Sequence, residues 1–492
     1  MYWKVKGGNK TAMGKKDGAV SGLFWKFAER ICAQGVSFVL SVILARLLMP
    51  EDYGTIALVL VFIDVANVFV SSGLGESLVQ KKDSDDEDFS TIFFCNLGFT
   101  FILYGILFVA APYIAGFYQN PLLTSVIRVL SIKLIITGVN SIQHAYVQKN
   151  MLFRRFFYST IIGTVVSGII GIIMAYHGFG VWALVTQYLV NSTMDTCVLA
   201  ITVKWRPKFL FSVKAAKQLI GYGWKVMAAS LLTVGYNKLR SLIIGKLYST
   251  ADLAFYNKGE QLPSLIVNNI DSSVNSVMLP VYAKCNDSVK RVHDKLRETI
   301  RLETFLLFPL LAGLAGVGER LISILLTEKW LPCVPYMMVL CVYYAYVPVS
   351  TASSTAIKAV GKSDVFLKSE TFKRILYITV LLLSVKHGVM AIALTNIVTV
   401  IIGFIVAGFF LKKYLNYTFR EQLSDIFPAL TMSLSMTVVV YWIGKQSGNN
   451  ILILMIQVAT GIVLYIGFAL LTRNHSLNVV SQYIKKIIHR KK

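Results

Sequence analysis

The sequence predicts an all-α polytopic membrane protein with about fourteen transmembrane helices. Of its 492 residues, 55% are apolar and only 15% are charged. A soluble protein of this length needs far more charge to cover its surface. Apolar runs of roughly 18 residues or more recur along the whole chain, and each run is long enough to cross a bilayer as a helix. A weak internal repeat divides these runs into two similar halves.

The apolar runs define the predicted spans, and several of the loops between them are only a few residues long. Charged residues inside the first, seventh and eighth runs blur the limits of those spans. In chain order the predicted spans are 20–47, 54–80, 90–117, 122–147, 156–177, 180–203, 214–248, 253–282, 300–327, 333–357, 366–386, 388–411, 425–444 and 450–472.

The internal repeat relates the first two spans to the seventh and eighth. The Trp-Lys pair that ends at Lys26 returns at Lys225, 199 residues later, and Asp52 returns as Asp252 at a spacing of 200. Both copies run from an apolar segment through a short polar break into a second apolar segment. Two similar apolar halves are typical of transporters whose lobes move against each other around a central site.

The repeat and the basic loops together predict how the chain is organised. The segments are a basic cytoplasmic tail (1–19), an N-lobe of six spans (20–203), a basic cytoplasmic linker (204–213), a C-lobe of six spans (214–411), two extra spans (412–472) and a second basic cytoplasmic tail (473–492).

The net charge of +24 indicates membrane topology rather than nucleic-acid binding. Alternate loops and the two tails hold 35 of the 49 Lys and Arg residues, whereas the opposite loops hold only Lys329, Lys386 and Lys445. This positive-inside pattern places both termini in the cytoplasm. The basic loops are suited to contact with anionic lipid headgroups. The Lys-rich tail runs into a first span that is too long for a cleavable signal.

The sequence gives no sign of an enzyme, a cofactor site or a metal site. It contains no HExxH, GxSxG or P-loop motif, and the outward-facing loops are too short for the exposed chemistry of a membrane glycosyltransferase or polymerase. An acidic run from Asp83 to Asp88 could hold a divalent cation. Because it lies just before a span, capping of the next helix is the favoured interpretation. The six cysteines form no CxxC pair and are interpreted as small apolar side chains.

Charged side chains inside the spans are the candidate functional residues. Each costs ~2.5–3.5 kcal/mol on insertion scales, so such residues usually face a wet cavity or a partner. They include Lys26, Glu29, Arg30, Asp64, Arg128, Lys133, Lys225, Lys238, Arg240, Lys258, Glu260 and Asp271. Most belong to the first two helices of each half.

The central charges are mostly basic, which predicts a cationic cavity for an anionic substrate such as a diphosphate. The predicted substrate-binding residues are Arg30, Lys258, Arg240, Lys238 and Lys26. Lys26 lies near the cytoplasmic surface, where snorkelling is an alternative explanation. Asp64 and Asp271 are candidate ion-coupling residues, although each could instead make a hydrogen bond between helices.

Six stretches resemble the Wzx-type polysaccharide repeat-unit flippases of the multidrug/oligosaccharidyl-lipid/polysaccharide superfamily. They are Ala45–Gly54, Gly73–Gln80, Phe255–Pro263, Ser276–Val281, Glu328–Leu331 and Ala356–Asp364. The resemblance covers about residues 20–415. It implies two six-helix lobes of the MATE/MurJ-like kind, followed by two extra helices. Arg30 and Lys258 match best the cationic positions of related lipid flippases. The basic stretch Asn237–Arg240 departs from the acidic residue that many relatives carry there, which puts carboxylate-based coupling through this helix in doubt.

The resemblance implies a flippase of the bacterial inner membrane. Its substrate would be an undecaprenyl-diphosphate-linked glycan for O-antigen, capsule or exopolysaccharide, moved to the outer leaflet by alternating access. Membrane lipids, a polysaccharide polymerase and other assembly proteins are candidate partners. A cation-coupled drug antiporter of the same superfamily is the main alternative, although a basic cavity would repel cationic drugs. A membrane glycosyltransferase or polymerase, or a scaffold without transport, are further alternatives.

Overall fold

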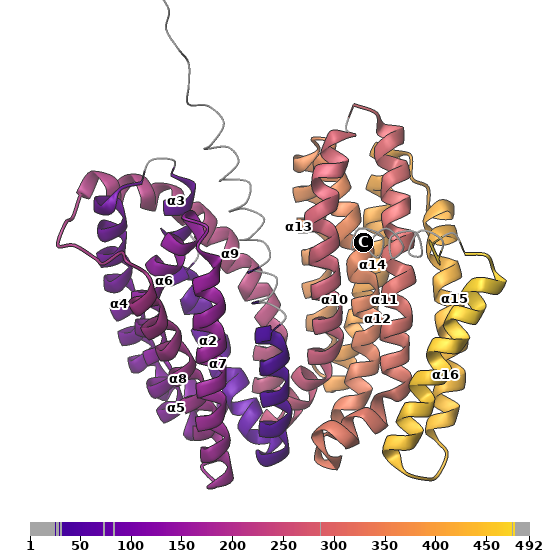
Figure 1. Cartoon of the computed structure of the whole chain (residues 1–492), viewed down its shortest axis with the longest axis horizontal. Helices are drawn as coiled ribbons and strands as arrows, with labels where there is room; N and C mark the ends of the chain where they lie inside the picture. Colours follow the sequence, from indigo (N-terminus) through magenta and orange to yellow (C-terminus); the bar gives the residue numbers. More distant parts are fainter. Residues whose placement is uncertain are drawn as a thin grey trace, which may run out of the picture. The chain divides into compact units, whose positions relative to one another are not determined.

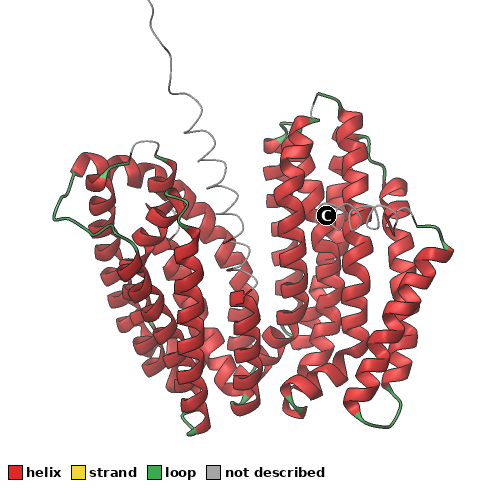
Figure 2. Ribbon diagram, in the orientation of Figure 1, coloured by secondary structure: helices red, strands yellow, loops and turns green. Residues whose placement is uncertain are grey.

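The protein is helical throughout the part of the chain that can be described. The computed structural model describes residues 25, 29, 32–71, 74–81, 84–285, 287–474 and 476–477, and these residues include no strand (Figure 2). Two of the predicted cavity residues, Lys26 and Arg30, lie outside the described residues.

Each predicted span overlaps a helix or two consecutive helices. The elements are a first helix at Cys32–Leu47, α2 Pro50–Ser71, α3 Leu74–Gln80, α4 Asp86–Tyr118, α5 Leu122–Leu130, α6 Ile132–Lys149, α7 Phe153–Tyr176, α8 Val181–Thr202, α9 Val213–Leu247, α10 Thr250–Lys284, α11 Val289–Leu326, η1 Glu328–Cys333, α12 Val334–Ala359, α13 Ser363–Ser384, α14 Val389–Leu415, α15 Phe419–Gly444 and α16 Asn450–Leu471.

Within the described residues, nine helical segments are long and apolar enough to cross a membrane by length and composition. The helix Cys32–Leu47 is apolar but shorter. Four other predicted spans form α8, α9, α10 and α13, which are long but more polar. The polarity of α9 and α10 follows from the candidate functional charges that they carry. The figure of fourteen crossings therefore stays a prediction.

The chain divides into two compact units, Met1–Ala254 and Phe255–Lys492, with the division inside α10 (Figure 1). Helix α9 packs against α2, α3 and α4, so it lies in the first unit. The lobe limits predicted from the repeat place the same helix in the second half. The two compact units are defined by packing, whereas the lobes are defined by the sequence repeat. The predicted lobe limits therefore stay a prediction.

The two copies of the repeat have the same local structure. The first copy breaks between Leu47 and the start of α2, and the second breaks between Leu247 and the start of α10. In the first break the Met49 backbone N–H donates to the Asp52 carboxylate over 3.1 Å. In the second the Ser249 backbone N–H donates to Asp252 over 3.2 Å. Each aspartate thus satisfies a backbone donor at the start of its helix.

The acidic run before α4 caps that helix, as predicted. The Asp85 side chain accepts from the Asp88 backbone N–H over 2.9 Å, and Asp88 accepts from the Asp85 N–H over 3.3 Å. This reciprocal pair is a capping box. Lys81 adds an ion pair to Asp88 at 2.5 Å.

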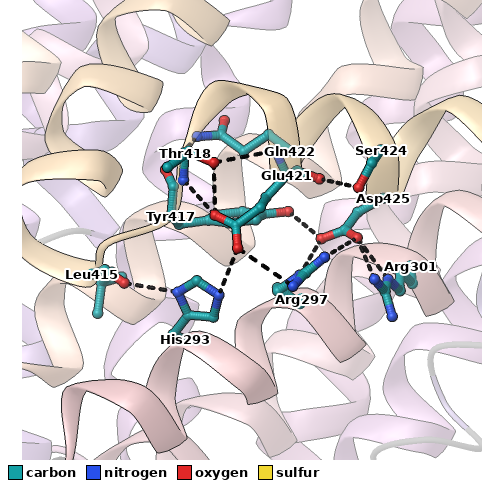
Figure 3. A network of polar contacts seen from close by, with 10 residues as sticks. All are labelled: His293, Arg297, Arg301, Leu415, Tyr417, Thr418, Glu421, Gln422, Ser424 and Asp425. Atoms are coloured by element: carbon teal, nitrogen blue, oxygen red, sulfur yellow. Dashed lines mark hydrogen bonds and ion pairs between the residues drawn. The ribbon is translucent and has the colours of Figure 1, made fainter.

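An ionic network joins α15 to α11 within the second unit (Figure 3). Asp425 of α15 accepts from Arg297 of α11 over 2.7 Å and from Arg301 over 2.6 Å. Tyr417, in the turn before α15, donates to Asp425 over 2.8 Å. Burial raises the pKa of the Tyr417 hydroxyl, so this group remains a donor. The network fixes the start of α15 on α11.

Candidate functional site

Two predicted site residues meet in the first unit. The Lys238 ammonium of α9 lies 2.7 Å from the Asp64 carboxylate of α2. The two side chains are 35% and 37% exposed, so the pair is open rather than sealed in the packing. The structure therefore pairs Lys238, a predicted substrate-binding residue, with Asp64, a predicted ion-coupling residue.

A second lysine belongs to the same cluster. Lys133, near the start of α6, interacts electrostatically with Asp64. Its ammonium also lies 5.2 Å from the centre of the Tyr188 ring, a cation–π contact with α8. We call Lys133, Lys238 and Asp64 the lysine cluster. Two ammonium groups against one carboxylate leave it with one net positive charge, which suits an anionic ligand.

Arg240 follows Lys238 by two positions on α9 and is half-buried. Side chains two residues apart on a helix point to different faces. The Cβ atoms of Lys238 and Arg240 therefore leave α9 in different directions. A contact between Arg240 and substrate stays a prediction.

Lys258 of α10 is buried in the second unit, with 7% of its surface exposed. Its ammonium donates to the Gln261 side chain over 3.2 Å and lies 5.6 Å from the centre of the Trp330 ring. In this structure the side chain packs rather than lines an open space. Its predicted contact with substrate is not tested by this arrangement and stays a prediction.

Asp271 of α10 takes part in a chain of hydrogen bonds. It accepts from the Asn275 side-chain amide over 2.8 Å, and the Asn275 carbonyl oxygen accepts from Thr355 of α12 over 3.1 Å. Asp271 also interacts electrostatically with Glu303 of α11. These contacts fit the inter-helix bonding that was the alternative to ion coupling.

A polar groove of about 430 Å³ lies in the first unit, and sequence analysis did not identify it. Most of its lining comes from α6 and α8, which pack against each other (Figure 1). The lining residues are Ser71, Gly75, Thr137, Asn140, Ser141, His144, Ala145, Gln148, Asn191, Ser192, Asp195 and Thr196.

A hydrogen-bonded triad organises the groove. The Asp195 carboxylate accepts from the Asn140 side-chain amide over 2.5 Å and lies 2.9 Å from His144 Nε2. The His144 ring stacks on Phe156 with the ring centres 4.8 Å apart. These contacts hold one carboxylate and one imidazole in place among hydroxyl and amide groups.

The groove continues from the lysine cluster along the same helices. Thr137 follows Lys133 by four residues on α6, and Ser192 follows Tyr188 by four residues on α8. Residues four apart share a helix face, about 6 Å apart along the axis. A ligand anchored at the lysines can therefore extend into the groove.

The triad was not predicted, although Asp195 is a charged side chain inside the predicted span 180–203 and so carries the same signal as Asp64. Asn140 and His144 are four residues apart, and Asp195 is the one ionisable carboxylate of α8. The spacing of Asn140 and His144 on α6 was readable, but no local pattern indicates that they meet Asp195 of α8. Lys133 was noted as a charge within a span but was not chosen as a site residue.

The chain resembles known proteins along most of its length. Residues 43–335 match the family described as "Polysaccharide biosynthesis protein", which is more than half of the chain. The "Teichuronic acid biosynthesis protein TuaB" of Bacillus subtilis is 22% identical over 91% of this chain and 94% of its own length. The "Lipopolysaccharide biosynthesis protein WzxC" of Escherichia coli is 22% identical over 88% of this chain and 89% of its own length.

A solved structure shares the fold. "Lipid II flippase MurJ, inward closed conformation" superposes with a TM-score of 0.73 at 15% identity, covering 92% of this chain and 99% of that one. At this identity the likeness concerns the fold alone, and it confirms the predicted all-α polytopic architecture of the MATE/MurJ-like kind. Together with the family match over residues 43–335, it identifies this chain as a multi-pass membrane protein that belongs to the polysaccharide biosynthesis protein family.

Proposed function

We propose that the protein is a flippase that moves an undecaprenyl-diphosphate-linked oligosaccharide repeat unit from the cytoplasmic to the outer leaflet. The names of its relatives concern surface polysaccharides, namely teichuronic acid and lipopolysaccharide. The observation that carries the proposal is the lysine cluster. Two lysines and one aspartate lie in helices of a membrane protein, and the Lys238–Asp64 pair is partly open to a ligand. An anionic diphosphate is the headgroup that such a site can hold.

In this mechanism Lys133 and Lys238 bind the diphosphate, while the lipid tail stays in the bilayer. Asp64 holds the Lys238 ammonium in position when no substrate is bound, and the arriving diphosphate competes with it. Asp64 limits the cost of an unpaired charge within the membrane. Arg30, Arg240, Lys258 and Lys26 are proposed as further cationic contacts along the transport path.

The driving force is proposed to be a proton or sodium gradient coupled through carboxylates. Asp64 is the stronger candidate, because it exchanges contacts with the two lysines that bind substrate. Asp271 is the second candidate, through its link with Asn275 and Glu303. Collapse of each gradient in turn, in sealed vesicles that are transporting substrate, identifies the coupling ion.

Leaflet accessibility of the lipid-linked repeat unit tests the proposed activity. In vesicles that contain the protein, the unit is expected to become accessible on the outer leaflet, and in protein-free vesicles it should stay inside. Lys238→Gln and Lys133→Gln are each expected to lower the rate roughly tenfold, because each removes a charged hydrogen bond worth about 1.5–3 kcal/mol. Lys386→Gln, in a predicted outer loop, is the matched control and should keep the wild-type rate.

The outcomes separate the parts of the proposal. An unchanged lipid distribution with wild-type protein refutes the flippase activity for this substrate, and export of cationic drugs is then measured instead. Transport at the wild-type rate in both lysine variants refutes the lysine cluster as the binding site. The same measurement on Arg30→Gln, Arg240→Gln and Lys258→Gln decides whether those residues contact substrate.

A further inference from the structure

We propose that the polar groove between α6 and α8 is a carbohydrate subsite that holds the sugars nearest the diphosphate of the lipid-linked substrate. This inference rests on the proposed function and adds to it a site for the glycan. The groove has a volume of about 430 Å³, which is within the range of about 300–1,000 Å³ typical of small-molecule sites.

The chemistry of the lining favours a neutral, hydroxyl-rich ligand. The groove presents serine and threonine hydroxyls, side-chain amides, one imidazole and one carboxylate. These groups supply both donors and acceptors, which a sugar hydroxyl needs because it donates and accepts at once. Asp195 supplies a charged acceptor, and its bonds to Asn140 and His144 hold it in place.

The same lining disfavours the other parts of the substrate and other ligand classes. No lysine or arginine lines the groove as the structure describes it, so a diphosphate would meet the Asp195 carboxylate without a compensating cation. A lipid tail would leave the polar lining without hydrogen bonds, at a cost for each buried group. No group of three or more His, Cys, Asp or Glu side chains in the described part of the chain could hold a metal ion.

The position of the groove fits a glycan attached to a bound diphosphate. Lys133 of the lysine cluster lies one helical turn from Thr137 on α6, and Tyr188, whose ring it contacts, lies one turn from Ser192 on α8. Thr137 and Ser192 line the groove nearest the lysine cluster, and the rest of the lining on α6 and α8 lies nearer the helix ends at Lys149 and Thr202. Under the predicted topology those ends are cytoplasmic, which is the side where the glycan starts.

Helix α8 offers a matched pair of variants. Thr196 lines the groove, whereas Thr193 does not. Both hydroxyls donate to the backbone carbonyl four residues earlier over 2.8 Å, at Ser192 and Leu189 respectively. Thr196→Val and Thr193→Val therefore remove the same local hydrogen bond, and only the first changes the groove. Asp195→Asn is the second groove variant, because it keeps the shape of the side chain and removes its charge.

Transport and competition are measured in vesicles with the lipid-linked repeat unit as substrate and sugar-free undecaprenyl diphosphate as competitor. Thr196→Val is expected to lower transport about fivefold and Asp195→Asn about tenfold, with Thr193→Val unchanged. The competitor should inhibit wild type and both groove variants at the same concentration within about twofold, because it needs only the lysines. Lys238→Gln should weaken the competitor.

The inference is overturned if the groove variants transport like Thr193→Val. It is also overturned if they lose sensitivity to the sugar-free competitor, since the groove would then serve the diphosphate or the general packing. A second readout does not depend on transport. At the same concentration, the oligosaccharide released from its lipid should raise the melting temperature of purified wild-type protein more than that of Thr196→Val. If the wild-type protein transports nothing, the flippase proposal fails. Independently of transport, the subsite is refuted if the oligosaccharide changes neither melting temperature or shifts those of wild type and Thr196→Val equally.

Discussion

Glu303 is the least satisfied ionisable residue in the second unit. Its side chain is fully buried in α11, and neither carboxylate oxygen has a hydrogen-bond partner among the described residues. Its electrostatic neighbour is Asp271, another carboxylate. Leaving a buried polar group without a partner costs about 1–3 kcal/mol in proteins. A residue kept at such a cost needs a role that packing alone does not supply.

Replacement of Glu303 by methionine should therefore stabilise the fold. Methionine has a similar length and needs no hydrogen bond, so Glu303→Met is expected to raise stability by about 1–3 kcal/mol, seen as a higher melting temperature in detergent. Glu319→Met, at an exposed position of the same helix, is the control and should give no such gain. A lower melting temperature for Glu303→Met would show that the carboxyl group has a stabilising partner.

At the scale of single residues, the sequence identified charges but not their partners. Asp64 and Lys238 were both recognised as ionisable groups within spans, and the structure pairs them. That pair joins helices more than 170 residues apart in sequence, and no local pattern encodes such a contact. Lys258 looked like a cavity residue because it is charged, yet it is buried against Trp330. Charge within a span predicts a partner, and an aromatic ring can be that partner.

At the scale of elements, the helices that follow the two breaks of the repeat, α2 and α10, come into close backbone contact. A Cβ atom on Gly54 of α2 would lie 1.7 Å from the Thr250 carbonyl oxygen at the start of α10. Gly245 of α9 similarly faces Leu58 of α2, where a Cβ atom would lie 2.3 Å from a methyl carbon. Glycine thus allows α2 to pack tightly against the second copy of the repeat, as small residues do between membrane helices.

Gly54→Ala should disturb this packing, because backbone atoms cannot move aside as a flexible side chain can. We expect a loss of about 1–3 kcal/mol, typical of overpacked sites, measured as a lower melting temperature and a lower yield of folded protein in detergent. Gly105→Ala in α4 is the matched control, since no described atom lies within 4 Å of its added Cβ. An equal response of the two variants would contradict the close contact.

One buried carboxylate strengthens the attachment of α15 to α11. The Asp425 side chain is fully buried between Arg297 and Arg301 (Figure 3). Asp425→Ala is expected to cost about 1.5–3 kcal/mol, because it removes hydrogen bonds to charged groups and leaves the buried Tyr417 hydroxyl without its acceptor. Limited proteolysis should then cut near Tyr417 before the rest of the second unit. Lys295→Ala removes an exposed pair with Glu298 and should cost at most about 1 kcal/mol. A stable Asp425→Ala variant would show that the other contacts of α15, including the Glu421 pairs with His293 and Arg297, are enough to hold it.

At the scale of the whole molecule, hydrophobicity alone predicted where the helices lie, because a helix in lipid must be long and apolar. It was a weaker guide to which helices cross the membrane. α9 and α10 carry many of the candidate functional charges, and α8 lines part of the polar groove, and none of these helices is among the apolar spans. The grouping of α9 with the first unit also escaped prediction, since the repeat reports sequence equivalence and not packing.

Reporter fusions decide whether the polar helices cross. An enzyme reporter that is active only outside the cytoplasm is fused after Asn150, Gly178, Gly361 or His387. The positive-inside pattern predicts activity at Gly178 and His387 and none at Asn150 and Gly361. One helix, α7, separates the first two positions, and α13 alone separates the last two.

The middle interval is the critical one. Five predicted spans, α8 to α12, lie between Gly178 and Gly361, so the two positions fall on opposite sides only if an odd number cross. Failure of one of α8, α9 and α10 to cross would put Gly361 outside and invert the signal there and at His387. A fluorescent reporter that folds only in the cytoplasm should give the complementary pattern at all four positions. If both reporters give the predicted pattern, the result supports the crossing of the helices that carry the lysine cluster and the groove. If both give the inverted pattern at Gly361 and His387, the result refutes the fourteen-span topology.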